Sequence, residues 1–443
     1  MPQYQKLGEI PRKHHIWFHR NHGAKTYKDE GIAYEHVITT EGFNEAYSIM
    51  YHLRPPTRVR SVELIKCEEL KKVTDAPLRH HHLKAANVPR KGDLYTGRIP
   101  MLFNQDMIAY RLKPEKAYGE YEYYRNGGAD EIIFVFKGAG TLESPFGKLR
   151  YRAEDYIVIP RGITYRLVPD KVEEEDYLIL ESTGPVRIPR RYLNGDGQIR
   201  MGAPYSERDF HGPSEIILID KEEDVAVLVK DGPRWTRVVH AHHPFDVLGW
   251  DGFVYPFTFN AQDFEPITGT VHQPPPIHQT FEIRGYVVCT FAPRLLDYHP
   301  EAVKIPWVHD NVEADEVLFY LIGHEPVSDA ARDDDVILRA ITLLSENRFN
   351  CAAAFEDKDD LIGSAVLIIL ELAVRFFGAG APCGHVLIEK NRNAAAIEIA
   401  LSRNVRRAQM MMTERTVRRL LQLLALQELD ATHARGRTQM IHD

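Results

Sequence analysis

An eight-residue segment occurs twice in this chain, and the repeat constrains the architecture more than any other feature. The copies read YRNGGADE at 124–131 and HDNVEADE at 309–316, and their Asn, Ala, Asp and Glu positions coincide. In both copies the last glutamate is followed by six mostly apolar residues and a glycine, Gly138 or Gly323. The pattern predicts a duplicated unit made of a strand and a turn.

The two copies differ in one respect that bears on chemistry. The second pairs a histidine, His309, with Glu316, whereas the first has Tyr124 and Glu131 in the same places. Imidazole and carboxylate are ligands that suit iron and similar metals. We therefore expect a metal in the second copy and none in the first. A hydrogen-bonded polar pair at a strand edge is the alternative interpretation of His309 and Glu316.

Composition limits the class of protein. The chain has 443 residues, long enough for roughly two to three domains, and its net charge of −8 gives no electrostatic reason to expect nucleic acid or anionic lipid. Four dispersed cysteines predict neither a disulfide framework nor a thiolate zinc site. The N-terminus lacks a signal-peptide core, and the apolar run at 365–377 is too short to span a bilayer. We expect a cytoplasmic protein without membrane contact.

The chain changes character near residue 330. Before it, short β-type runs are bounded by Gly, Pro and Asp, a spacing typical of all-β sandwiches and barrels. These runs lie at 132–136, 156–159, 177–181, 216–219, 225–229, 287–291 and 317–322. From 331 to 443 there is one proline and no tyrosine, and 413–429 has apolar residues at helical spacing. We predict a helical tail, and we interpret its basic stretch at 390–437 as a solvated helix face rather than a polyanion site.

The spacing His309-x6-Glu316-x6-Gly323 resembles the first sequence motif of cupins, small β-barrels in which a histidine and a glutamate reach inward to a metal. Four further segments are similar to the homogentisate 1,2-dioxygenase family, especially its bacterial members: YHLRPPT at 51–57, VHQPPPIHQTFE at 271–282, VCTFAPR at 288–294 and KIPWVHDN at 304–311. The resemblance covers about residues 4–325. It implies a mainly β, two-cupin jelly-roll fold. A metal-free cupin would occupy 1–200, the metal-bearing part 201–330, and an atypical helical segment 331–443.

The resemblance also implies an activity. It is the O₂-dependent opening of the homogentisate ring to maleylacetoacetate, in tyrosine and phenylalanine catabolism, at one Fe(II) in the second cupin of a trimer-based homo-oligomer. A facial triad of two histidines and one carboxylate leaves neighbouring positions on Fe(II) for substrate and O₂. His309 and Glu316 match two of these three ligands.

The third ligand falls where this sequence departs from the family pattern. The family places two histidines in a segment that aligns with 341–351, and Leu344 and Asn350 take their positions here. An amide oxygen is a weak substitute for imidazole at Fe(II), so His385 in the tail is the alternative third ligand. Glu325 takes the position of a family tyrosine that helps to hold the substrate, and a carboxylate there would repel an acidic substrate.

A histidine near a proline-rich loop is the candidate acid/base residue. His272 approximately matches the family histidine that handles a substrate hydroxyl proton, and His278 is the competing candidate. Histidine titrates near neutral pH without perturbation, as a general base requires. A hydrogen-bonded loop histidine is the alternative interpretation of either residue.

Three other features receive structural interpretations. Pro160-x-Gly-x-x-Tyr165 has the shape of the second cupin motif, with Tyr165 where a ligand histidine would stand, so the first cupin is expected to be metal-free. His80–His82 are consecutive, and consecutive strand residues point to opposite faces, so they are not expected to share one ion. Cys289 lies in an apolar strand pattern and is interpreted as a core residue.

Two other functions stay open on the sequence alone. A bicupin binding or structural protein with a vestigial metal site is favoured by Asn350 and by the unmatched tail. A gentisate-type cupin dioxygenase would use similar ligands on a related dihydroxy-aromatic acid.

Overall fold

The computed structural model describes most of the chain up to residue 292 and shorter stretches beyond it. The described residues are 3–16, 18, 21–22, 25–26, 31–72, 87–267, 275–292, 299, 301, 314–321, 339–346, 350–351, 386–391 and 394–399. Contacts divide the chain into two compact units, Met1–Pro326 with Ile337–Ile368 and Val327–Val336 with Ile369–Asp443. No helix among the described residues is long and apolar enough to cross a membrane.

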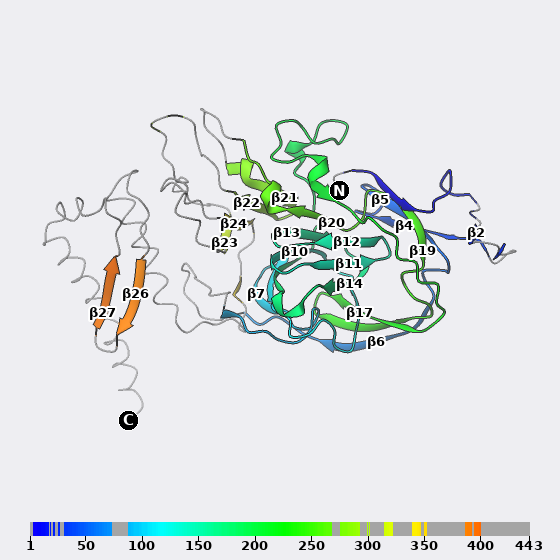
Figure 1. The fold of residues 1–443 in the computed structure, drawn as a ribbon, viewed down its shortest axis with the longest axis horizontal. Coiled ribbons are helices and arrows are strands. Elements are labelled where there is room, and N and C mark those ends of the chain that lie inside the picture. Colours follow the sequence, from blue (N-terminus) through cyan, green and yellow to red (C-terminus); the bar gives the residue numbers. More distant parts are fainter. Residues whose placement is uncertain are drawn as a thin grey trace, which may run out of the picture. The chain divides into compact units, whose positions relative to one another are not determined.

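Two large sheets form the centre of the first unit (Figure 1). The larger contains, in spatial order, β16 (Phe210–His211), β20 (Phe257–Asn260), β13 (Asp155–Ile159), β10 (Asp130–Lys137), β15 (Asp176–Ser182), β8 (Met107–Leu112), β7 (Ile99–Phe103) and β25 (Asn350–Cys351). The other contains β12 (Gly147–Tyr151), β11 (Gly140–Ser144), β14 (Thr164–Pro169), β9 (Tyr123–Asn126), β17 (Val225–Asp231), β18 (Arg234–His240) and β6 (Val59–Cys67). Among the described strands, only β9 and β17 pair in parallel.

Smaller sheets complete the described structure. One four-stranded sheet has the order β1 (Gln5–Gly8), β19 (Val247–Gly252), β5 (Tyr47–His52) and β4 (Tyr34–Thr39). Another has the order β21 (Gln279–Ile283), β22 (Tyr286–Phe291), β24 (Arg339–Ser345) and β23 (Asp315–Leu321). Two hairpins are formed by β2 (Asn21–His22) with β3 (Lys25–Thr26), and by β26 (Val386–Asn391) with β27 (Ala394–Ile399). Short 3₁₀ turns lie at η2 (Val172–Glu174), η3 (Arg190–Tyr192), η4 (Glu207–Asp209), η5 (Ala261–Asp263) and η6 (Pro275–His278).

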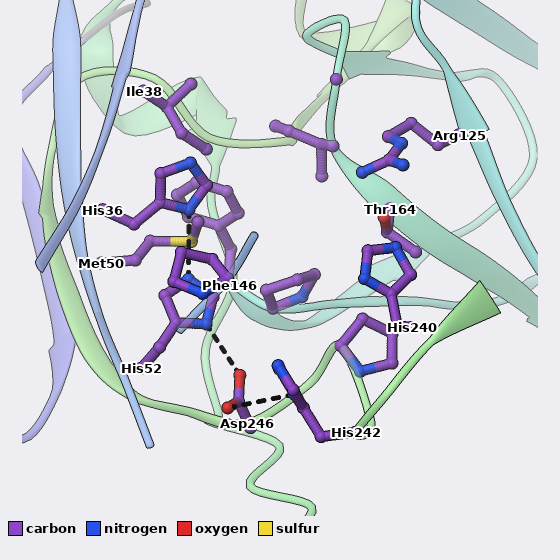
Figure 2. Close-up of a pocket in the computed structure, with 15 residues that line it drawn as sticks. His36, Ile38, Met50, His52, Arg125, Phe146, Thr164, His240, His242 and Asp246 are labelled. Atoms are coloured by element: carbon purple, nitrogen blue, oxygen red, sulfur yellow. Dashed lines mark hydrogen bonds and ion pairs between the residues drawn. The ribbon is translucent and has the colours of Figure 1, made fainter. Parts of the chain in front are cut away.

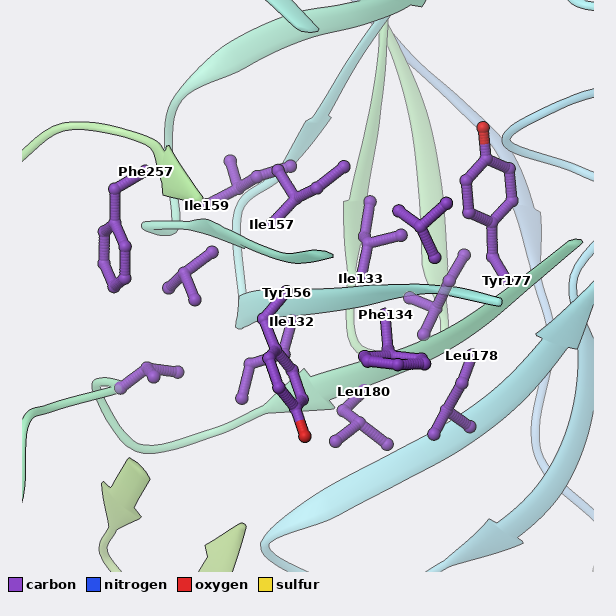
Figure 3. Close-up of a cluster of buried hydrophobic side chains, with 14 of the residues drawn as sticks. Ile132, Ile133, Phe134, Tyr156, Ile157, Ile159, Tyr177, Leu178, Leu180 and Phe257 are labelled. Carbon is purple, nitrogen blue, oxygen red and sulfur yellow. The ribbon is translucent and has the colours of Figure 1, made fainter. Parts of the chain in front are cut away.

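The core is densest around β10 (Figure 3). Ile132, Ile133, Phe134 and Val135 are consecutive, and each is at most 1% exposed. Because consecutive strand residues point to opposite faces, both faces of β10 are covered. Side chains of β13 and β15 pack beside it, including Tyr156, whose ring centroid lies 4.8 Å from that of Phe134.

The strand-and-turn unit predicted for the first copy of the repeat is confirmed. The segment leaves β9 in one large sheet and enters β10 in the other. Gly138 follows β10 with φ +100°, where a Cβ would collide with the Glu175 carboxylate. In the second copy, Glu316 lies near the start of β23, and Gly323 lies outside the described residues. The mainly β, cupin-like architecture predicted from the sequence is confirmed.

Two predictions about elements are corrected. The run at 216–219 is not a strand, because its segment makes only isolated bridges, Lys148 with Glu215 and Leu218 with Asp246. Where the structure describes residues 331–443, they form strands β24 to β27 rather than helices. β24 is held on both sides by β22 and β23, and its Ile341 and Leu343 are fully buried on one face. The predicted helix at 413–429 lies outside the described residues.

Glu175 gives the fold a pH dependence. It has no exposed surface and lies beside the Tyr151 hydroxyl, and burial raises its pKa from 4.5 to about 7. A carboxyl whose pKa is higher in the folded state contributes stability below pH 4.5 that is lost as the pH rises through about 7.

In the unaltered protein, ionisation of Glu175 should lower the free energy of unfolding between pH 5 and pH 8. We expect Glu175→Gln to remove about 2–3 kcal/mol of this decrease, because glutamine does not titrate. Urea unfolding of both proteins at the two pH values measures this difference. Glu174→Gln, at an exposed neighbouring position, is the control. An unchanged pH dependence in Glu175→Gln would contradict the prediction.

Candidate functional site

The second copy of the repeat places Glu316 on an edge strand of its sheet. Glu316 is half-buried on β23, directly opposite Leu344 of β24. Residues that face each other in antiparallel strands have Cβ atoms about 4.5–5.5 Å apart. Leu344 is one of the two positions at which the family pattern has a histidine, so this position lies beside the candidate carboxylate ligand.

A buried thiol lies near the same carboxylate. Cys289 on β22 is 5% exposed, which confirms its interpretation as a core residue. Burial raises its pKa to about 12, and the negative charge of Glu316 adds to the shift. Without a bound metal, the thiol therefore stays protonated at neutral pH.

The other predicted site residues fall in three places. His309, His272, His385 and His80–His82 lie outside the described residues. His278 ends η6, and its ring stacks on Phe291 with centroids 4.2 Å apart. Asn350 lies in β25, which pairs with β7 of the eight-stranded sheet and not with β23. Within the described part of the chain, no group of three or more His, Cys, Asp or Glu side chains is arranged to hold a metal.

In the first copy, the three positions that correspond to cupin ligands converge. Tyr165 donates to Oε2 of Glu131 at 2.6 Å, and Tyr124 donates to Oε1 at 3.4 Å. Arg98 forms an ion pair with the same Oε1, so both carboxylate oxygens of Glu131 have partners. The Arg98 guanidinium thus lies beside the Glu131 carboxylate, in the copy that was predicted to be metal-free.

The network extends to a second carboxylate. Glu181 on β15 accepts from Arg98 at 3.1 Å and forms an ion pair with Lys230 of β17. Burial by itself would lower the pKa of Arg98, but Glu131, the two tyrosines Tyr124 and Tyr165, and Glu181 together outweigh burial, and the pKa is raised well above its ordinary value. Two buried cations therefore face two buried carboxylates.

Removing one member of this network should destabilise the fold. Arg98→Met leaves Glu131 and Glu181 buried with Lys230 as their remaining cation, and breaking a buried pair in this way costs about 3–5 kcal/mol. The free energy of unfolding from denaturant titration measures the loss. Arg150→Met removes an exposed ion pair with Asp170 and should change stability little. Equal effects of the two substitutions would contradict the assignment.

A histidine-rich pocket lies elsewhere in the first unit (Figure 2). Its volume is about 60 Å³, and its polar lining comes from β4, β5, β9, β14, the last residue of β18 and the segment that follows β18. The lining residues used below are His36, His52, Arg125, His240, His242 and Asp246. Nδ1 of His52 lies 2.7 Å from Oδ1 of Asp246, and Nε2 of His52 lies 3.2 Å from Nδ1 of His36.

Sequence reasoning did not identify this pocket. The segment HAHH at 240–243, followed by Asp246, was a usable signal because three histidines gather within four residues. His36, His52 and Arg125 carry no comparable local signal. They meet only because β4, β5 and β9 come together in the fold.

Comparison with known proteins identifies the family. The sequence profile described as homogentisate 1,2-dioxygenase N-terminal matches residues 96–261, a range that contains Arg98, Glu131 and Glu181. A protein of Saccharolobus solfataricus, provisionally named as a dioxygenase, is 37% identical over 320 residues, covering 72% of this chain and 80% of that protein. The homogentisate 1,2-dioxygenases of Bradyrhizobium diazoefficiens and Emericella nidulans are each 26% identical, covering 46% and 44% of this chain.

The fold and these matches define a mainly β, cupin-like protein of a dioxygenase class. The chain belongs to the homogentisate 1,2-dioxygenase-like family. Its match spans less than half the length of the two named homogentisate dioxygenases, 46% and 44% respectively.

Proposed function

We propose that the protein is an iron-dependent dioxygenase that opens the ring of a dihydroxy-aromatic acid, with homogentisate as the first candidate substrate. Family membership supports the reaction class. The main structural observation in support of the proposed metal site concerns Glu316. This residue is half-buried on an edge strand, and it faces Leu344, where the family pattern has a histidine. A homo-oligomer in the cytoplasm is the assembly and location that the family resemblance favours.

The proposed metal ligands are His309 and Glu316. Their imidazole and carboxylate would hold Fe(II), and the bound iron would supply a centre where O₂ and the substrate meet. The proposed donors are nitrogen and oxygen atoms, the set that non-haem iron sites use. Metal binding requires the imidazole to be neutral and the carboxylate to be ionised.

His272 is proposed as the residue that accepts a proton from a substrate hydroxyl. The competing candidate, His278, stacks on Phe291, and a stacked ring is less able to reorient towards a substrate. For the third ligand, Asn350 and His385 are both retained as candidates. Asn350 pairs with Phe103 in a different sheet from Glu316, which does not favour it.

The metal proposal predicts a difference between Glu316 of β23 and Glu346, which directly follows β24. Glu316→Gln and His309→Ala should lower iron affinity by about a hundredfold or more, since each removes a ligand. Glu346→Gln, at an exposed position at the end of β24, should leave the affinity unchanged, as should Tyr165→Phe in the first copy. Iron content after anaerobic Fe(II) reconstitution and desalting gives the comparison. Iron retention in Glu316→Gln would refute the site.

The strand register predicts a gain of function. Because Leu344 faces Glu316 directly, Leu344→His should place a second imidazole beside the carboxylate and raise iron occupancy. Glu346→His adds an imidazole two residues further on, at an exposed position just after the strand, and it should have no effect. Metal content and isothermal titration with Fe(II) measure both. Asn350→His and His385→Ala in parallel would distinguish the two remaining candidates for the third ligand.

Two alternatives give different results with the reconstituted protein. A gentisate-type enzyme would consume O₂ faster with gentisate than with homogentisate. A bicupin with a vestigial site would retain substoichiometric iron and consume O₂ with neither acid. Oxygen uptake across a panel of dihydroxy-aromatic acids, normalised to bound iron, separates these cases.

A further inference from the structure

The histidine pocket contains a cation that lacks a counterion. Arg125 lies on β9 and lines the pocket, and among the described residues no carboxylate forms an ion pair with it. Burial lowers its pKa, which means that its charge is partly removed from water without compensation. A desolvated charge without a partner is costly, so the site is electrostatically prepared for an anion.

The only carboxylate that lines the described pocket is already engaged. Asp246 accepts from the backbone N–H of Arg54 at 3.0 Å and lies 2.7 Å from Nδ1 of His52. Nε2 of His52 lies 3.2 Å from Nδ1 of His36. Nε2 of His36 makes no hydrogen bond to another described residue, so it is available to a ligand.

A second ring nitrogen is also unpaired. His240 is 7% exposed, and its buried Nε2 has no hydrogen-bond partner in the part of the chain that the structure describes. Figure 2 shows His240 and Arg125 on one side of the pocket, opposite the pair of His36 and His52. Burial lowers the pKa of His36 and of His240 to about 4, and in both cases the positive charge of Arg125 adds to the shift. Both rings are therefore neutral at neutral pH and face the arginine.

The available donors and the space define the ligand. A guanidinium binds a carboxylate through two parallel hydrogen bonds. The volume of about 60 Å³ exceeds what one water needs, roughly 10–15 Å³, and suits a few heavy atoms. A metal is not favoured, since His52 uses both ring nitrogens within the network.

We propose that this pocket binds the carboxylate of a small organic acid, with the Arg125 guanidinium as counterion and the ring nitrogens of His36 and His240 beside it. The pocket lining includes no residue of β21 to β24, where Glu316 lies. The proposal is therefore independent of iron binding and of ring cleavage.

The test uses the full chain with ¹⁵N-labelled histidine, titrated with acetate and, separately, with acetamide as the uncharged isostere. Acetate should perturb the His36 and His240 resonances saturably, and acetamide should not. Acetate should also raise the pKa of both rings, because its negative charge offsets that of Arg125. The charged or titratable groups that face His36 are His52 and Arg125. Those that face His240 are Arg125, His242 and Asp246. Arg125 is the permanently charged group that lowers the pKa of both rings.

Two variants make the assignment specific. Arg125→Gln should weaken acetate binding by about tenfold or more, as loss of a charge-assisted pair predicts. Arg150→Gln removes an exposed arginine that does not line the pocket and should have no effect. Absence of saturable binding, equal binding of acetamide, or an unchanged affinity in Arg125→Gln would overturn the proposal. Tighter binding of inorganic phosphate than of acetate would overturn the carboxylate assignment. If Arg125→Gln fails to fold, the acetate and acetamide titrations of the unaltered protein still decide the outcome.

Discussion

The buried charge network around Arg98 is the interaction on which the centre of the first unit depends. Its members come from both large sheets, since Glu131 and Glu181 belong to β10 and β15 of one sheet and Lys230 to β17 of the other. Each of these charges is at most 5% exposed in its side chain, so each would be costly to bury without the others. Buried ion pairs around Arg98 therefore connect the two large sheets.

The first copy of the duplicated motif has surroundings that differ from those of the second copy. In the first copy, Tyr124 and Tyr165 supply hydroxyls to Glu131, and Arg98 supplies the positive charge that a metal would otherwise provide. The first copy is thus satisfied by its own side chains. In the second copy, Glu316 lies on the edge strand of a smaller sheet, opposite the apolar Leu344.

Much of the fold could be predicted from the sequence, because the informative signals were local. The runs around 132–136 and 177–181 became β10 and β15, and the glycine after the repeat became a turn with positive φ. Positions 124, 131 and 165 met as the motif predicted. The strand β24 was missed because its seven residues have no helical or strand signature strong enough to outweigh the composition of the surrounding tail. Its conformation is decided by pairing with two partners distant in sequence.

The pocket could not be predicted because it depends on which face of a strand meets which neighbour. Tyr124 and Arg125 are adjacent on β9, and consecutive strand residues point to opposite sides. Tyr124 is fully buried and contacts the Arg98 network, whereas Arg125 lines the pocket. One short strand therefore serves both sites. The two arginines differ in compensation, because Arg98 has two carboxylates and Arg125 has none among the described residues. The paired arginine stabilises the fold, and the unpaired one is left to attract an anion.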